Sequence, residues 1–190
     1  MLPLSVAFLG GANGSWRVER QEGVAGAPLA RVARVRVVEG EPALGPVGDA
    51  AWTLRGVTSN ERYVTRGEQD RLVARQAPLG RPEATSAALI PITKSDAWWE
   101  LAQDERRGIL EERSRHVALS LDYLPAIARR LHHGRDLGEP FDFLTWFEFA
   151  PANTGLFEDL VGRLRATEEW QYVAREIDIR LVRSAQNGDD

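Results

Sequence analysis

The stretch FDFLTWFEF, residues 141–149, is the strongest fold signal in this sequence, because it carries apolar side chains at both odd and even positions. Side chains alternate between the two faces of a strand, so this pattern is typical of a strand that is buried on both sides. Residues 126–133 precede it and predict another strand, which begins after Pro125. The sequence therefore predicts two consecutive strands, the second of which is fully buried.

A helix and a further strand are predicted downstream. Asn153 is suited to cap the helix, with acidic residues in its first turn and arginines in its last, as the helix dipole favours. One face of that helix is apolar and consists of Leu156, Phe157, Leu160, Val161 and Leu164. Residues 175–183 alternate, which predicts a strand. Its inward residues are Ile177, Ile179 and Leu181, and its outward, solvent-facing residues are Glu176, Asp178 and Arg180.

Helices are predicted upstream of residue 125. Ser95 or Asp96 caps a helical turn that carries two tryptophans, and Asp104 opens a long helix that ends at Pro125. Apolar positions in the long helix recur at helical spacing, at Ile109, Leu110, Val117, Leu121 and Leu124.

The N-terminal part is predicted to contain strands, loops and one short helix. Strands are predicted at residues 33–38, 51–57 and 87–92, and the apolar residues 1–11 are expected to form an arm or a strand rather than a secretory leader. Glycines and prolines in residues 39–50 predict a loop. Thr65 and Glu68 have the spacing of a capping box, which opens a helix through Arg75. Pro91 predicts that its strand lies at an edge or ends there.

The order of these elements predicts two similar α+β halves that divide near Lys94 and share one sheet system. We expect a single domain over residues 1–190, with an N-terminal half of about residues 1–93 and a C-terminal half of about residues 94–183.

The composition is typical of a globular protein, since 43% of its 190 residues are hydrophobic. Lysine and arginine total 24 against 28 aspartates and glutamates, and this net charge of −4 argues against nucleic acid as a partner. No run of about 18 apolar residues occurs, so we expect no transmembrane helix and no membrane partner.

Cysteine is absent from the chain, and lysine occurs only once. The chain has no cysteine, which excludes disulfides, thiolate metal sites and cysteine nucleophiles. Lys94 is the single lysine among 24 basic residues. Either compositional bias left one lysine, or this position needs a compact ammonium that the planar guanidinium of arginine cannot replace.

Sequence motifs for phosphate binding and serine hydrolysis do not occur. Residues 10–14 are glycine-rich but match no phosphate-binding loop, so they predict a turn. There is no Gly-x-Ser-x-Gly nucleophile elbow. His132 and His133 are adjacent on a predicted strand and point to opposite faces, so they cannot bind one metal together and are expected to be surface or structural residues.

His116 lies at the border of the apolar stripe of the predicted long helix. Its position fits a hydrogen-bonded core histidine, since no second histidine or carboxylate stands at a convincing zinc spacing. If it binds a metal, that metal brings its other ligands with it. Haem does so and needs one axial imidazole and a large apolar slot. The six tryptophans and six phenylalanines could build such a slot or simply form the core.

Several stretches together resemble the chlorite dismutase family of haem proteins. These are residues 52–64 (WTLRGVTSNERYV), 88–99 (ALIPITKSDAWW), 111–133, 137–151 (LGEPFDFLTWFEFAP) and 164–181. Their order and spacing both agree with the family, and the lack of a long N-terminal extension is similar to its shorter, dimeric branch. The resemblance implies a dimeric α/β-barrel built from two ferredoxin-like halves, with one haem b in the C-terminal half.

The resemblance also implies the roles of individual residues. His116 matches the proximal ligand of the haem iron, and Arg129 matches the distal, catalytic arginine, with the strand register deciding between it and Arg130. Glu169, rather than its neighbour Glu168, matches the carboxylate partner of the proximal histidine.

Further positions match residues around the cofactor. Lys94 matches the family's proximal-side lysine and would tether the carboxylate or the haem propionates. The remaining implied residues are Trp98, Trp99, Asn60 and Tyr63 as cofactor-binding residues, Gln76 near the distal arginine, and Phe143, Phe147 and Trp146 as apolar groups of the distal pocket.

The resemblance implies an enzyme that converts chlorite to chloride and dioxygen and forms an O–O bond. Arg129 would attract the anion and retain the chlorine-bearing fragment until that bond forms. The implied partners are chlorite, as a small anionic substrate, and a second copy of the chain in a homodimer. We expect a cytoplasmic location, since the start of the sequence has no clear leader.

Other interpretations stay open. Coproheme decarboxylases of the same superfamily carry glutamine at the position of Arg129 and tyrosine at that of Trp99, and both differences argue against this activity. A non-catalytic haem carrier or sensor is another alternative. The simplest is a barrel without a cofactor, in which His116 only packs.

Overall fold

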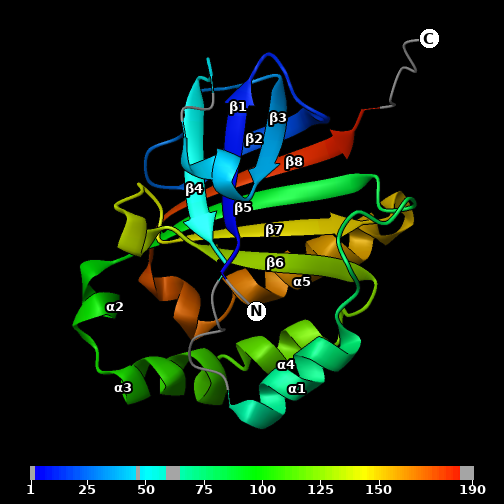
Figure 1. Cartoon of the computed structure of the whole chain (residues 1–190). Helices are drawn as coiled ribbons and strands as arrows, with labels where there is room; N and C mark the ends of the chain where they lie inside the picture. Colours follow the sequence, from blue (N-terminus) through cyan, green and yellow to red (C-terminus); the bar gives the residue numbers. More distant parts are fainter. Residues whose placement is uncertain (1–2, 46–47, 59–64, 185–190) are drawn as a thin grey trace.

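The computed structural model describes residues 3–45, 48–58 and 65–184 (Figure 1). Its strands are β1 (Ser5–Gly11), β2 (Trp16–Ala25), β3 (Arg34–Glu39), β4 (Trp52–Val57), β5 (Ser86–Lys94), β6 (Ile127–His133), β7 (Phe143–Phe149) and β8 (Val173–Arg183). Its α-helices are α1 (Arg66–Arg75), α2 (Asp96–Glu100), α3 (Gln103–Arg107), α4 (His116–Leu121) and α5 (Thr154–Arg165). A π-helix, η2 (Gly108–Arg113), joins α3 to α4, and 3-10 turns occur at η1 (Glu41–Leu44), η3 (Arg135–Leu137), η4 (Pro151–Asn153) and η5 (Glu168–Tyr172).

The strands form one closed barrel in the order β1-β3-β2-β8-β5-β7-β6-β4. In this order the first four strands contribute the run β4-β1-β3-β2, and the strands from β5 onwards, called the second half below, contribute the equivalent run β8-β5-β7-β6. The second half has the β-α-β-β-α-β element order of a ferredoxin-like unit. In the first half, a short turn joins β1 to β2, and η1 joins β3 to β4. The predicted mixed α and β barrel is therefore confirmed.

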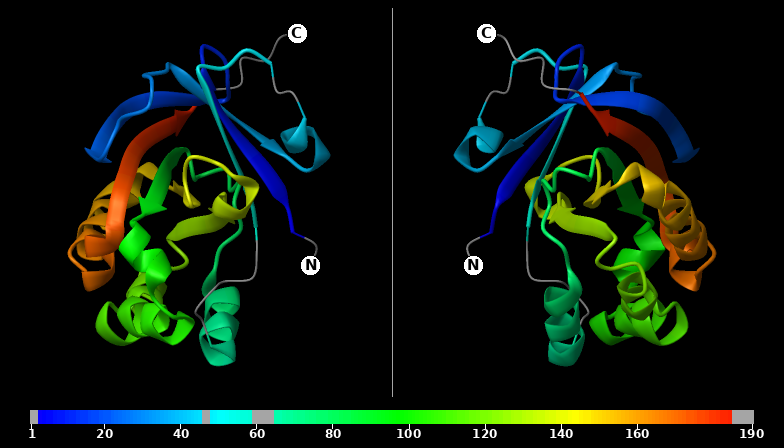
Figure 2. Two further views of the ribbon diagram at one scale, coloured as in Figure 1. Left: turned by 90° about the vertical axis from the view of Figure 1, so that its left-hand side faces the viewer. Right: turned by 90° about the vertical axis from the view of Figure 1, so that its right-hand side faces the viewer.

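The helices gather along β5, β7 and β6, whereas β1, β2 and β3 lie at the other end of the molecule (Figures 1 and 2). This distribution follows from the element order, because α2 to α5 all belong to the second half. Two apolar layers result. One fills the barrel interior and includes Phe8, Leu144, Trp146 and Ile179. The other lies between the outer face of the second-half strands and α5 and includes Phe147, Phe149 and Phe157.

Most predicted elements are present within one or two residues of their expected ends. The capping box is complete, because the Thr65 hydroxyl accepts from the Glu68 N–H and the Glu68 carboxylate accepts from the Thr65 N–H. Strand β1 realises the arm or strand expected near the N-terminus. Strand β2 was missed, because its sequence WRVERQEGVA carries several charged residues and much of it is exposed.

The prediction that Pro91 marks a strand edge is wrong. Strand β5 lies inside the sheet and pairs with both β7 and β8. Pro91 pairs with Leu144 of β7, whereas the pairing with β8 is interrupted between Leu89 and Ile92, as expected beside a residue that has no N–H.

The long helix predicted from Asp104 to Pro125 is also wrong, because the structure divides it into α3, η2 and α4. The break lies at Arg115, which has a φ of 52° in the left-handed region. Consequently His116 is the first residue of α4 and does not lie in mid-helix.

The predicted outward face of β8 is buried instead. Glu176 and Asp178 are each 1% exposed, because α5 covers this face of the strand. Arg165 of α5 pairs with both carboxylates, and Arg180 pairs with Asp178 and with Glu158. Both faces of β8 are therefore buried. One face is apolar, and the charged residues of the other face are neutralised by ion pairs.

His132 makes the stability of the barrel depend on pH. It is 1% exposed, lies edge-on to Phe8, and its Nδ1 bonds to the Leu144 carbonyl. Burial lowers the pKa of His132 from 6.5 to about 4. The unfolded chain therefore takes up a proton at a higher pH than the native protein, and this favours unfolding as the pH falls from about 6.5 towards 4.

We predict that replacing His132 with leucine removes this pH dependence. In the wild type, His132 alone should lower the free energy of unfolding by up to roughly 1.4 kcal/mol per pH unit below pH 6.5. Urea unfolding at pH 7 and at pH 5 gives, for each protein, the difference in the free energy of unfolding between the two pH values. An equal difference in the wild type and in His132→Leu would contradict the prediction.

Candidate functional site

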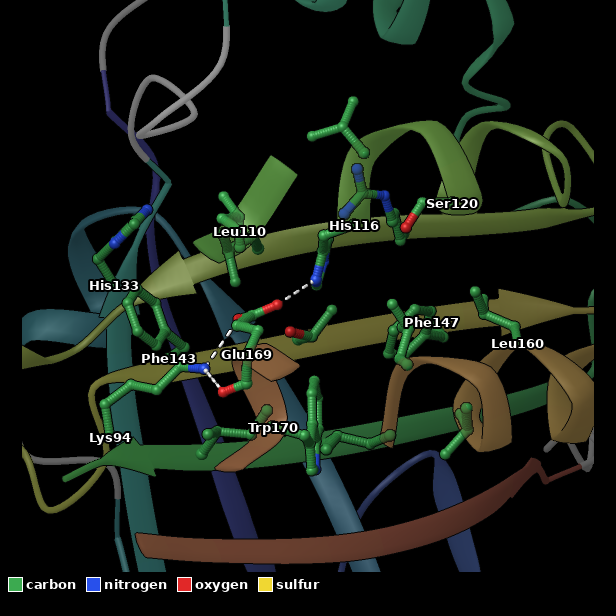
Figure 3. Close-up of a pocket in the computed structure, with 18 of the residues that line it drawn as sticks. Lys94, Leu110, His116, Ser120, His133, Phe143, Phe147, Leu160, Glu169 and Trp170 are labelled. Carbon is green, nitrogen blue, oxygen red and sulfur yellow. Dashed lines mark hydrogen bonds and ion pairs between the residues drawn. The ribbon is translucent and has the colours of Figure 1, made fainter. Parts of the chain in front are cut away.

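A largely apolar cavity lies between the outer face of the second-half strands and the helices that cover them (Figure 3). The space within it and in front of it amounts to about 1110 Å³, open solvent included. Alternate residues of three strands line one side of it, namely Ile90, Ile92 and Lys94 of β5, Arg129, Leu131 and His133 of β6, and Phe143, Thr145 and Phe147 of β7. The other side comes from the helices and from η5, with Leu72, Trp98, Leu110, His116, Val117, Ser120, Leu160, Val161, Leu164, Glu169 and Trp170.

His116, Glu169 and Lys94 form a hydrogen-bonded network at this cavity (Figure 3). The Nδ1 atom of His116 lies 2.6 Å from Oε2 of Glu169. The Lys94 ammonium donates to the other carboxylate oxygen at 2.8 Å and to the Glu169 main-chain carbonyl at 3.3 Å. The carboxylate thereby joins the end of β5 to the start of α4, and it leaves Nε2 as the second nitrogen of the imidazole.

The surroundings keep Glu169 ionised. Burial alone would raise its pKa, but the charges and hydrogen bonds of His116 and Lys94 outweigh that effect and lower the pKa to about 2. A carboxylate that accepts the Nδ1 proton holds the imidazole in one tautomer and makes its other nitrogen a better electron-pair donor.

Aromatic rings surround the Lys94 ammonium. Its Nζ lies 4.7 Å from the ring centroid of Trp98 and 5.6 Å from that of Trp170. The Trp170 indole in turn donates to Glu176 at 2.8 Å. A buried ammonium that contacts a carboxylate and two π faces is stabilised without water, so this position accommodates the only lysine of the chain.

Strand β6 directs two adjacent arginines to different places. Arg129 lines the cavity, whereas Arg130 extends away from it and pairs with Glu39. Gln76, at the end of α1, donates to the main-chain carbonyl of Arg129. It therefore lies beside the arginine, but it is not among the residues that line the cavity.

Trp146 does not belong to the distal pocket, contrary to the sequence-based expectation. It faces the barrel interior, where it packs against Phe8 and Trp16 and donates to Glu148. Neighbouring residues on a strand point to opposite faces, so Trp146 and Phe147 cannot both face the cavity. Phe147 does face it, as does Phe143.

The two tryptophans of α2 also differ. Trp98 lines the cavity and is 1% exposed. Trp99 is not among the lining residues. It stacks on Phe143, lies under Arg135 and donates to Asp142. The expected cofactor residues Asn60 and Tyr63 lie outside the described residues.

Sequence reasoning missed several residues of the site. His133 was expected to be a surface or structural residue, but it is buried and lines the cavity. The available signal was its position two residues after Leu131 and four after Arg129, because these positions share one face of a strand. Leu110, Ser120 and Trp170 carried no comparable signal, since helix and turn geometry brings them to the cavity.

The residues present fit a cofactor that supplies most of its own metal ligands. Within the described residues, no group of three or more His, Cys, Asp or Glu side chains could hold a bare metal ion. The cavity offers instead one imidazole whose Nδ1 is already bonded, a large apolar lining and the guanidinium of Arg129. One axial nitrogen in an apolar cavity is what a haem requires of its protein.

Comparison with known proteins gives the family. The sequence profile described as "Chlorite dismutase" matches residues 35–184. The chain belongs to the chlorite dismutase family. The match spans strand β3 to the end of β8, and therefore includes the whole cavity.

Individual chlorite dismutases agree with this assignment. The crystal structure of a dimeric chlorite dismutase from Nitrobacter winogradskyi is 55% identical, has a TM-score of 0.87, and the match covers 94% of this chain and 99% of that one. A curated chlorite dismutase from Ideonella dechloratans is 28% identical over 69% of this chain, which spans only 45% of that protein. The chlorite dismutase from Candidatus Nitrospira defluvii, at 19% identity over 96% of this chain and 91% of its own, shares the fold with a TM-score of 0.69.

We predict that Lys94→Met strongly destabilises the protein, because it leaves the buried Glu169 carboxylate with one partner fewer. Breaking a buried ion pair costs roughly 3 kcal/mol or more. Arg113→Ala is the matched control, since it removes the exposed Arg113–Glu168 pair next to the site, and such pairs contribute less than about 1 kcal/mol. Urea unfolding of the protein without added haem measures both effects, and equal losses in the two variants would contradict the prediction.

Proposed function

We propose that this chain is a haem b-dependent chlorite dismutase that converts chlorite to chloride and dioxygen. The observation that carries the proposal is the convergence of two groups on one apolar cavity, the carboxylate-bonded imidazole of His116 and the guanidinium of Arg129. The 55% identity to a dimeric chlorite dismutase over nearly the whole chain supports the same activity.

His116 would hold the cofactor. Its Nδ1 is bonded to Glu169, so Nε2 is the nitrogen that can bind iron. When bound, haem would supply the redox-active iron at which chlorite is converted. Lys94 and the two indoles around it would keep the Glu169 carboxylate in place and ionised.

Arg129 would act on the anion. A guanidinium is always charged, and in apolar surroundings its attraction for an oxyanion is far stronger than in water. The cavity-facing side chains beside it, Leu131 of β6 and Phe147 of β7, are apolar. The protein as a whole is net negative, so the attraction of chlorite depends on this local charge.

The second task of Arg129 would be retention. The overall reaction converts one chlorite to one chloride and one dioxygen, so both oxygen atoms must remain at the site until they are joined. Holding a reacting fragment in attack geometry contributes on the order of 7 kcal/mol at best. A fixed cation that keeps the chlorine-bearing fragment in the cavity would therefore favour O–O bond formation over escape as hypochlorite.

Two further properties stay predictions. We propose a homodimer, as in the dimeric relative from Nitrobacter winogradskyi, and light scattering of the purified protein tests it. Within the described residues, no helix combines the length and the apolar character that crossing a membrane requires. The cytoplasmic location expected from the sequence is likewise a proposal.

We predict that the purified protein, supplied with hemin, develops a Soret band and releases dioxygen from chlorite. An oxygen electrode measures the release, and His116→Ala should lose most of the haem and with it the activity. A protein that ignores hemin would support a cofactor-free barrel. A haem-loaded protein that leaves chlorite unchanged would support a carrier or sensor, and conversion of coproheme to haem b would support decarboxylation.

We predict that Arg129→Ala lowers chlorite turnover by about tenfold, equivalent to about 1.4 kcal/mol of transition-state stabilisation, and increases the escape of hypochlorite. A chlorination trap in the assay detects the escaped oxidant. Arg130→Ala is the matched control, because this neighbouring arginine points away from the cavity towards Glu39. If both variants turn over chlorite and leak hypochlorite as the wild type does, Arg129 has no such role.

A further inference from the structure

The backbone immediately before His116 departs from ordinary helical geometry. In the π-helix η2, the Ser114 N–H donates to the Ile109 carbonyl at 3.0 Å. Arg115 follows with a φ of 52°, and a residue with a side chain is strained in this left-handed region. Such a conformation persists only where neighbouring contacts hold it. The contacts at this junction therefore determine where α4 starts.

The Glu111 carboxylate provides two of these contacts. Its Oε2 accepts from the Val117 N–H at 2.8 Å, and its Oε1 accepts from the Ala118 N–H at 3.3 Å. Both N–H groups lie in the first turn of α4, where an α-helix has no internal acceptors for them. Arg115, at the position before the helix, supplies no side-chain cap. Glu111 therefore caps α4 from the preceding helical segment.

Ser114 holds the other side of the junction. Its hydroxyl accepts from the Glu169 N–H at 3.0 Å, so the residue that bonds to the His116 imidazole is fixed to the same segment. His116 lies between Ser114 and the two N–H groups that Glu111 binds. A displacement of this segment would consequently change the position of the imidazole relative to the cavity.

We propose that Glu111 is a positioning residue for His116, whose two hydrogen bonds set the start of α4 and thereby the orientation of the imidazole. The inference rests on the proposed ligation of haem by His116. A carboxylate suits this task because it has two acceptor oxygens for two neighbouring donors. Glutamine would supply one acceptor and would place its NH₂ group against the second N–H.

The consequence for the cofactor is specific. Groups that orient a metal ligand commonly change metal affinity by roughly 10- to 100-fold when they are removed. A change in imidazole orientation also alters the iron–nitrogen bond itself, and the iron–imidazole stretching vibration of the ferrous protein reports that bond directly. Loss of global stability alone would leave this vibration unchanged.

The test compares haem-loaded wild type with Glu111→Ala, Glu111→Gln and Glu112→Ala. Glu112 is the matched control, because it is the adjacent glutamate and is exposed. We expect Glu111→Ala to transfer haem to excess apomyoglobin roughly 10- to 100-fold faster than the wild type and to shift or broaden the iron–imidazole band in the resonance Raman spectrum. In both haem transfer and band position, Glu111→Gln should lie between the wild type and Glu111→Ala, and Glu112→Ala should match the wild type.

The outcomes separate this inference from the proposed function. A wild type that binds no haem refutes the proposed function. Haem binding by the wild type, with an unchanged band and unchanged haem transfer in Glu111→Ala, overturns the positioning role, even if the thermal midpoint falls. If Glu111→Ala does not fold, Glu111→Gln decides, since a shifted band supports the proposal and an unchanged band overturns it.

Discussion

Glu169 is 5% exposed, and its carboxylate is shared between an ammonium and an imidazole. A buried negative charge costs several kcal/mol unless partners with good geometry compensate for it. The partners here come from distant parts of the chain, with Lys94 at the end of β5 and His116 at the start of α4. The interactions that compensate this one charge therefore join β5, α4 and the turn η5, and these three elements form one end of the cavity. The rest of the site depends on this constraint, because it also fixes which imidazole nitrogen remains available.

The strand side of the cavity depends on alternation. Strand β6 sends Arg129, Leu131 and His133 towards the helices and His132 into the barrel. On this one strand, Arg129 faces the cavity, whereas His132 faces the barrel interior and stays neutral because it is buried. The closed barrel permits this division, since each of its second-half strands has an apolar interior on one side and a helix layer on the other. Under the proposed function, side chains held on such strands would help to retain a small fragment.

Much of this arrangement was predictable where the signal is local. The alternation of β6 and the apolar character of β7 predicted both strands, and Thr65 with Glu68 predicted the start of α1. The match of His116 and Glu169 to a family pattern anticipated a contact that the structure contains. The errors arose where a distant segment decides the outcome. The charged face of β8 was expected in solvent, but α5 covers it and Arg165 neutralises it. The helix break at Arg115 was missed as well, and one of the contacts that hold it comes from the distant η5, where the Glu169 N–H donates to the Ser114 hydroxyl.

The sequence by itself therefore determined the number and kind of the second-half strands, the absence of thiol chemistry and the presence of an imidazole and of arginines as candidates for binding an iron and an oxyanion. These are properties of residue type and of short-range periodicity, which neighbouring residues settle among themselves. Only the tertiary structure decided which face of each strand meets the cavity. It placed Phe147 at the site and Trp146 in the barrel, and it brought Lys94 and Glu169 together across the chain. The physical reason is that alternation along a strand defines two faces but not the surroundings of either. Those surroundings depend on which segments pack against each face when the barrel closes.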